Sequence, residues 1–198
     1  VVTAMVEQLP TVRSVLVIPY LAPDPDCSQL PQAEHFDQAI KNATPITSFR
    51  RMPFNAPLYI LYSSGTTGAP KCIVHGIGGT LVQHIKEHRL HTNLRAGDTL
   101  FYFTTCGWMM WNWLVSGLAS QARIVLYEGN PTFPGPERLW QLAESEQINI
   151  FGTSAKYIDA IKNSGYRPAQ HVELTALHSI LSTGSPLSSD GFAFVYDA

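Results

Sequence analysis

Short runs of apolar residues alternate with segments of helical periodicity along most of the chain. The apolar runs predict strands at residues 15–18, 58–62, 72–75, 99–103, 122–127, 148–151 and 179–182. The periodic segments predict helices at residues 34–41, 80–90, 108–119, 137–146, 154–162 and 188–196. Strands that alternate with helices of this length imply right-handed crossovers between parallel strands. We therefore expect an α/β fold with a largely parallel sheet and flanking helices.

A loop rich in hydroxyl groups and glycine follows the strand expected at residues 58–62. Its sequence is Ser63-Ser64-Gly65-Thr66-Thr67-Gly68, and Ala69-Pro70 then leads to Lys71. Glycine lets backbone N–H groups approach an anion closely, and Lys71 adds a positive charge. A strand of the parallel sheet would place this loop at the carboxyl edge, where open α/β folds bind ligands. A polar hairpin turn is the alternative that the same residue types allow. The spacing differs from a Walker A loop, which disfavours a P-loop kinase or GTPase.

Composition and charge restrict the classes of protein that fit. Hydrophobic residues make up 45% of the chain and charged residues 14%, which favours a packed core over disorder. The net charge is −2 without a basic run, so we expect no nucleic-acid partner. We expect no membrane partner either, because no apolar run reaches the length of a span. The cysteines Cys27, Cys72 and Cys106 form no CxxC pair, which favours a reducing compartment, the cytosol.

Residues 62–71 resemble the phosphate loop of the adenylate-forming enzymes, the AMP-binding superfamily that includes acyl-CoA synthetases and firefly luciferase. The resemblance implies that this loop holds the β- and γ-phosphates of ATP. The residues that inherit this role are Ser63, Ser64, Gly65, Thr66, Thr67, Gly68 and Lys71, with Thr66 and Lys71 also expected to be catalytic. The resemblance extends along nearly the whole chain and is closest from residue 58 onward. It implies that the chain is part of the large N-terminal domain of such an enzyme.

Two segments that flank this loop resemble short-chain acyl-CoA synthetases within the superfamily. Residues 74–81 are similar to the segment after the phosphate loop, so His75 is expected near the phosphates, with packing an equal alternative. Residues 104–113 resemble the segment beside the acid pocket, and their Gly-Trp-Met-Met-Trp-Asn-Trp form looks most like the enzymes that activate acetoacetate. By this resemblance Trp108 and Met109 line the pocket. Spacing alone would instead assign the Trp and Met residues of this segment to the core.

A third resemblance lies near the C-terminal end of the chain. The loop Gly184-Ser185-Pro186 is similar to the loop that packs against adenine, with Ser185 in place of the usual acidic residue. Thr183 corresponds to a position that bounds the acid pocket. Lys156 departs from the pattern of acetyl-CoA enzymes, and we expect it either to face the keto oxygen of the acid or to lie in solvent at a helix start.

Three histidines were the only candidates for a metal site. His84, His88 and His91 fall at i, i+4 and i+7 of a predicted helix, so their imidazoles share one face. No carboxylate completes a known zinc pattern, and the charged neighbours Lys86 and Glu87 favour a solvated surface. We therefore predict no metal ligands.

The resemblance implies an acid–thiol ligase that uses acetoacetate, ATP and CoA as substrates, with Mg²⁺ bound to the nucleotide. Acetate or propionate in place of acetoacetate is the first alternative, and a truncated product without activity is the second. The family pattern continues after Pro186 into an acidic Mg²⁺ site and a C-terminal domain with a catalytic lysine, which residues 1–198 do not contain. We therefore expect an incomplete N-terminal domain that is inactive on its own.

Overall fold

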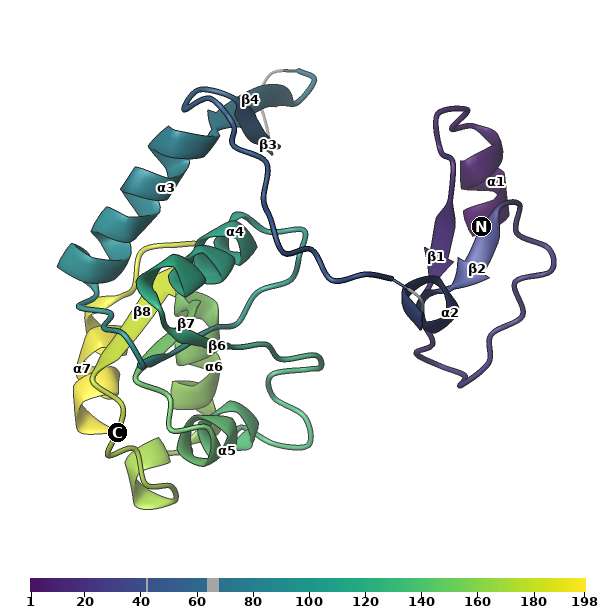
Figure 1. Ribbon diagram of the computed structural model, residues 1–198. Helices are drawn as coiled ribbons and strands as arrows, with labels where there is room; N and C mark the ends of the chain where they lie inside the picture. Colours follow the sequence, from purple (N-terminus) through teal and green to yellow (C-terminus); the bar gives the residue numbers. More distant parts are fainter. Residues whose placement is uncertain (42, 64–67) are drawn as a thin grey trace. The chain divides into compact units, whose positions relative to one another are not determined.

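The computed structural model describes residues 1–41, 43–63 and 68–198, which divide into two compact units, residues 1–51 and 52–198. The first unit contains a parallel pair of short strands and two short helices (Figure 1). These elements are α1 (Val2–Glu7), β1 (Val15–Val17), β2 (Ala33–His35) and α2 (Phe36–Lys41). The sequence predicts β1 and α2 but not α1 or β2. Three residues of β2 are too few to show an alternating pattern.

The second unit begins with a hairpin formed by β3 (Pro57–Ser63) and β4 (Lys71–Gly76). The two strands are antiparallel, and Ser63 pairs with Lys71. In the described ranges β3 pairs with β4 and with no strand of the parallel sheet, so the expectation that β3 is a strand of that sheet is wrong. The loop at residues 63–68 therefore belongs to a hairpin. Residues 64–67, which carry four of the predicted phosphate ligands, lie outside the described residues.

The hairpin leads into α3 (Ile77–Lys86), which continues as the π-helical turn η1 (Glu87–His91). The remaining helices are α4 (Met109–Ser116), η2 (Gly117–Ser120), α5 (Arg138–Ser145), α6 (Ala155–Ser164), η3 (Pro168–Gln170) and α7 (Ser189–Asp197). Throughout the part of the chain that the structure describes, no helix has both the length and the apolar composition that a bilayer crossing needs.

Four parallel strands form the main sheet of the second unit. They are β5 (Thr99–Tyr102), β6 (Arg123–Val125), β7 (Ile150–Ser154) and β8 (Ser179–Thr183), in the spatial order β6-β5-β7-β8. Every adjacent pair is parallel. The α/β class and the parallel sheet with flanking helices are thereby confirmed (Figure 1).

The two faces of this sheet carry separate apolar cores. Phe101 and Phe151 point toward α5 and α6, where Phe151 stacks on Trp140 with ring centroids 4.8 Å apart. Leu100 and Ile150, their neighbours along the strands, belong to the other core, which packs against α4. Successive strand residues point to opposite faces, so a strand buried on both faces is apolar at consecutive positions. The continuous apolar runs of the sequence have this origin.

Candidate functional site

A cavity of about 320 Å³ lies at the carboxyl ends of β5, β7 and β8. We call it the strand-end cavity. The residues that line it come from those strand ends and from the start of α4: Tyr102, Phe103, Thr104, Thr105, Trp108, Met110, Thr153, Ser154, Thr183 and Gly184. Its volume lies at the lower end of the range of about 300–1,000 Å³ for small-molecule sites. This edge of a parallel sheet is the expected place for a ligand.

Hydrogen-bonded hydroxyl groups form one wall of the strand-end cavity. The hydroxyl of Tyr102 donates to the backbone carbonyl of Thr153 at 2.9 Å, and it lies 2.8 Å from the hydroxyl of Thr183. Burial raises the pKa of Tyr102, so the phenol is protonated at neutral pH. Gly152 makes room for the ring, because a Cβ atom at this position would lie 2.0 Å from Cδ2 of Tyr102.

Ser154 begins α6 and also lines the strand-end cavity. Its hydroxyl oxygen caps the helix by accepting a hydrogen bond from the backbone N–H of Tyr157 at 3.2 Å. Among the described residues, no acceptor takes the proton of the Ser154 hydroxyl. Ser154 therefore has a donor available to a ligand in the cavity.

The N-terminal turn of α4 supplies the apolar wall. Trp108 is the residue before the helix and lines the cavity, with 70% of its surface exposed. Met110 lines the cavity, whereas Met109 is half exposed and is not among the lining residues. Consecutive helical residues point about 100° apart, so Met109 and Met110 face different directions, and the pocket role of Met109 stays a prediction. Tyr102, Ser154 and Met110 were not singled out from the sequence.

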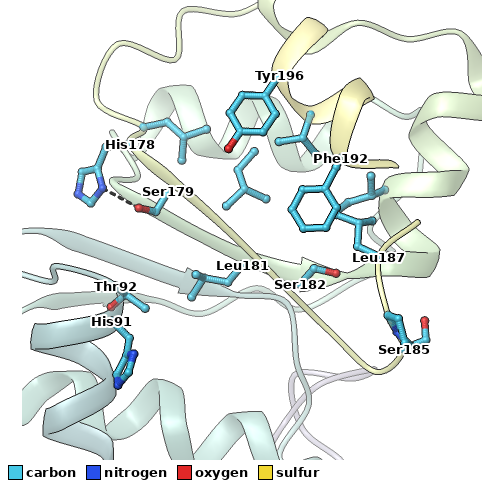
Figure 2. Close-up of a pocket in the computed structure, with 15 residues that line it drawn as sticks. His91, Thr92, His178, Ser179, Leu181, Ser182, Ser185, Leu187, Phe192 and Tyr196 are labelled. Carbon is cyan, nitrogen blue, oxygen red and sulfur yellow. Dashed lines mark hydrogen bonds between the residues drawn. The ribbon is translucent and has the colours of Figure 1, made fainter. Parts of the chain in front are cut away.

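A larger cavity, of about 770 Å³, lies beside β8 and α7. In Figure 2, Phe192 and Tyr196 lie over one side of β8, and His91 and Thr92 lie on the other. Ser185 and Pro186 line this second cavity, whereas Gly184 lines the strand-end cavity. The predicted adenine loop therefore divides between two cavities.

The remaining predicted residues that the structure describes lie outside both cavities. Lys156 is exposed on α6. His75 is half-buried in β4, with its ring centroid 5.2 Å from that of Tyr59. Lys71 is exposed and pairs with Ser63 across the hairpin, and Gly68 is also exposed. Ser64, Gly65, Thr66 and Thr67 lie outside the described residues, and the roles given to all of these positions stay predictions.

Comparison with known proteins decides the family. The chain matches the sequence profile described as "AMP-binding enzyme" over residues 2–198. The chain belongs to the AMP-binding enzyme family. The family inferred from the resemblance of residues 62–71 is thereby confirmed.

Individual members of the family are also similar to this chain. An acetoacetyl-CoA synthetase of Rhizobium meliloti is 60% identical over 149 residues, which are 75% of this chain and 23% of the relative. A malonamoyl-CoA synthetase of Penicillium aethiopicum is 46% identical over 164 residues, 76% of this chain and 23% of the relative. The solved structure of acetoacetyl-CoA synthetase from Streptomyces lividans matches with a TM-score of 0.87 at 42% identity, and covers 96% of this chain and 29% of that one. The chain thus spans less than a third of the length of these relatives.

Two of the three histidines considered for a metal site instead belong to a buried hydrogen-bond cluster between α3 and α4. His84 is 8% exposed and His88 is fully buried, so the prediction of a solvated surface is wrong for both. Nδ1 of His84 and Nε2 of His88 lie 2.9 Å and 3.0 Å from the hydroxyl of Ser116 on α4. Within residues 1–41, 43–63 and 68–198, no group of three or more His, Cys, Asp or Glu side chains is arranged to hold a metal.

The direction of each hydrogen bond in this cluster follows from the number of available protons. The hydroxyl of Ser116 donates its proton to the carbonyl of Trp113 at 2.6 Å. Both histidines must therefore donate to the oxygen of Ser116, which places the proton of neutral His88 on Nε2. Nδ1 of His88 is buried and has no hydrogen-bond partner among the residues that the structure describes. A second proton there would be a buried charge without an acceptor, and burial lowers the pKa of His88 to about 4.

This pKa predicts that the folded state loses stability in mild acid. Unfolded His88 has the ordinary pKa of 6.5. Between this pH and about 4 the unfolded chain binds more protons, so stability falls as the pH falls through this window. The full effect is about 3 kcal/mol, from about 1.4 kcal/mol per pKa unit. Thermal unfolding at several pH values measures it.

Nε2 of His88 also lies 3.0 Å from the carbonyl oxygen of Trp113. The variant His88→Gln tests the assignment, because an amide can donate to this carbonyl without titrating. We expect a flatter dependence of the unfolding midpoint on pH between about 6.5 and 4. The variant His91→Gln is the control, because His91 is exposed on the same π-helical turn. An unchanged pH profile in His88→Gln would assign the acid sensitivity to other groups.

Proposed function

We propose that the protein acts as an acid–thiol ligase that activates acetoacetate with ATP and transfers the acyl group to CoA. The identity of 60% with an acetoacetyl-CoA synthetase carries this proposal. In the first half-reaction the acid carboxylate attacks the α-phosphorus of ATP, which gives an acyl-adenylate and pyrophosphate. In the second, the CoA thiol attacks the acyl carbonyl and AMP leaves.

The hairpin loop between β3 and β4 is the proposed site for the triphosphate. Attack of a carboxylate on ATP brings like charges together, so catalysis requires neutralisation and alignment. Lys71 supplies a positive charge at the base of the loop, opposite Ser63. The exposed position of Lys71 leaves its ammonium group accessible to a phosphate. We assign no Mg²⁺ ligand, because the described carboxylates and imidazoles form no metal-binding group.

The strand-end cavity is the proposed site for the acid. Trp108 and Met110 supply apolar contacts for a short chain, and the hydroxyls of Ser154 and Thr183 supply polar ones. Malonamate is the second candidate acid, because the malonamoyl-CoA synthetase is 46% identical to this chain. Acetoacetate and malonamate have the same skeleton, with a carbonyl on the third carbon that carries a methyl group in one and an amino group in the other.

The test measures acid-dependent release of pyrophosphate and AMP by the full-length protein with ATP, Mg²⁺ and CoA. Acetoacetate, malonamate, acetate, propionate and butyrate are compared by kcat/KM. We expect the highest value for an acid with a carbonyl on its third carbon, with the matching acyl-CoA identified by mass spectrometry. Release of ADP and transfer of the γ-phosphate would contradict the proposal, and so would a preference for acetate or propionate.

The family match over residues 2–198 supports a further proposal, that both compact units belong to one N-terminal adenylation domain. The cytosolic location inferred from the cysteine pattern stays a prediction.

A further inference from the structure

The hydroxyl groups of Tyr102 and Thr183 form a pair whose direction can be derived by counting protons. The hydroxyl of Tyr102 has one proton, and the carbonyl oxygen of Thr153, 2.9 Å away, can only accept it. The 2.8 Å contact between Tyr102 and Thr183 must then use the proton of Thr183, which donates to the phenol oxygen. Thr183 is left with free lone pairs but no free proton.

The environment of Tyr102 holds this arrangement in place. The side chain is only 4% exposed, and its ring packs edge-on against Trp113 with centroids 6.0 Å apart. The other face of the ring meets the backbone at Gly152, where no Cβ atom would fit. The phenol oxygen lies 2.9 Å from the carbonyl oxygen of Thr153, so turning the proton away would leave two oxygen atoms in close contact with no proton between them, which is costly. Tyr102 therefore keeps its proton on that carbonyl.

We propose that Tyr102 is a positioning residue that fixes Thr183 as a hydrogen-bond acceptor toward the acid. Thr183 lines the strand-end cavity, so its lone pairs are presented to the acid chain. At the third carbon of the acid, Thr183 can then accept a hydrogen bond from an N–H group but gains none from a methyl group. This inference rests on the proposed function and deepens it, because it names the group of the acid that Tyr102 and Thr183 select.

Malonamate and acetoacetate form a matched pair of probes. They have the same number of non-hydrogen atoms and the same carboxylate, and both carry a carbonyl on the third carbon. Only malonamate offers an N–H group to Thr183. The available proton of Ser154 can meet the carbonyl that the two acids share. The ratio of kcat/KM for malonamate to that for acetoacetate therefore measures the hydrogen bond that Thr183 accepts from the N–H group. A general loss of structure would lower both kcat/KM values together and leave the ratio unchanged.

The experiment measures this ratio in the full-length protein and in Thr183→Val, which removes the hydroxyl at nearly constant volume. We expect the ratio to fall about tenfold, the effect of one hydrogen bond. In Tyr102→Phe the hydroxyl of Thr183 loses its acceptor on the phenol and can rotate, so Thr183 is no longer held as an acceptor toward the N–H group of malonamate. We expect this variant to lower the ratio also, by about threefold or more. In the double variant Tyr102→Phe/Thr183→Val the ratio should equal that of Thr183→Val alone.

Tyr157→Phe is the matched control. Its hydroxyl is also buried but has no hydrogen-bond partner, and the residue lies in the core on the opposite face of the sheet. This variant should leave the ratio unchanged. The inference is overturned if Thr183→Val changes the ratio less than twofold, or if Tyr102→Phe acts fully in the absence of the Thr183 hydroxyl. If neither acid supports pyrophosphate release, the proposed function is refuted instead. The two failures are therefore distinguishable.

Discussion

Replacing Lys71 with alanine is expected to lower the rate of adenylate formation by about two to three orders of magnitude, the usual effect of removing one group that stabilises developing charge. Lys71 lies at the base of the hairpin loop opposite Ser63, and its ammonium group would neutralise the charge that builds up on the departing pyrophosphate. Single-turnover measurement of pyrophosphate release at saturating acid checks the prediction. The affinity for the acid should change little, because Lys71 is not among the residues that line the strand-end cavity.

Lys86→Ala is the control for this substitution. Lys86 is also an exposed lysine, but it lies in the last turn of α3. Its loss should leave the rate of adenylate formation within about twofold, because an isolated surface charge contributes little. A loss of less than about threefold in Lys71→Ala would remove Lys71 from the catalytic residues.

Replacing Phe151 with alanine is expected to cause the largest loss of stability, about 3–5 kcal/mol. Phe151 is fully buried in the sheet centre, stacked on Trp140 and 5.1 Å from the ring of Phe101. Deleting the ring removes its transfer free energy and leaves a cavity among rigid neighbours. For a domain of this size the loss corresponds to a fall of roughly 6–20 °C in the unfolding midpoint, which calorimetry measures.

Phe192→Ala makes the same chemical change at a surface position. Phe192 on α7 is 55% exposed, so most of its ring is in contact with solvent already. Its removal should cost about 1 kcal/mol or less. Equal midpoints in the two variants would show that the aromatic stack around Phe151 does not limit the stability of the domain.

The elements of the main sheet were predictable from the sequence because their signals are local. The central strands β5 and β7 are apolar at consecutive positions, since each is buried on both faces. The helices α5 and α6 follow the expected period, with a polar face in solvent. The strand β2 and helix α1 escaped prediction because each is too short to establish a period.

The pairing of β3 with β4 could not be predicted from the same kind of signal. An apolar strand followed by a helix has the same pattern in a parallel sheet and in a hairpin that precedes a helix. The partner of a strand is chosen by long-range packing, which leaves no periodic trace in the strand itself. The burial of His88 is a similar case. Lys86 and Arg89 beside it are exposed, and only the packing of α3 against α4 brings His88 to Ser116.

The residues of the candidate site also divide into those that the sequence singled out and those that only the structure revealed. Thr183 and Trp108, which the resemblance assigns to the acid pocket, both line the strand-end cavity, and so does Met110. Their roles toward the acid, and that of Met109, stay predictions. Tyr102 was missed because an apolar strand signal gives a buried aromatic residue no role beyond packing.

The sequence by itself determined the family, the α/β class and the position of the loop proposed to bind phosphate, because these depend on contiguous residues. Only the tertiary structure decided which strands pair, which histidines are buried and which way the hydroxyl of Thr183 donates its proton. Tyr102, Thr153 and Thr183 come from three strands. Their hydrogen bonds exist only when β5, β7 and β8 lie side by side, because residues up to 81 positions apart must come within 3 Å.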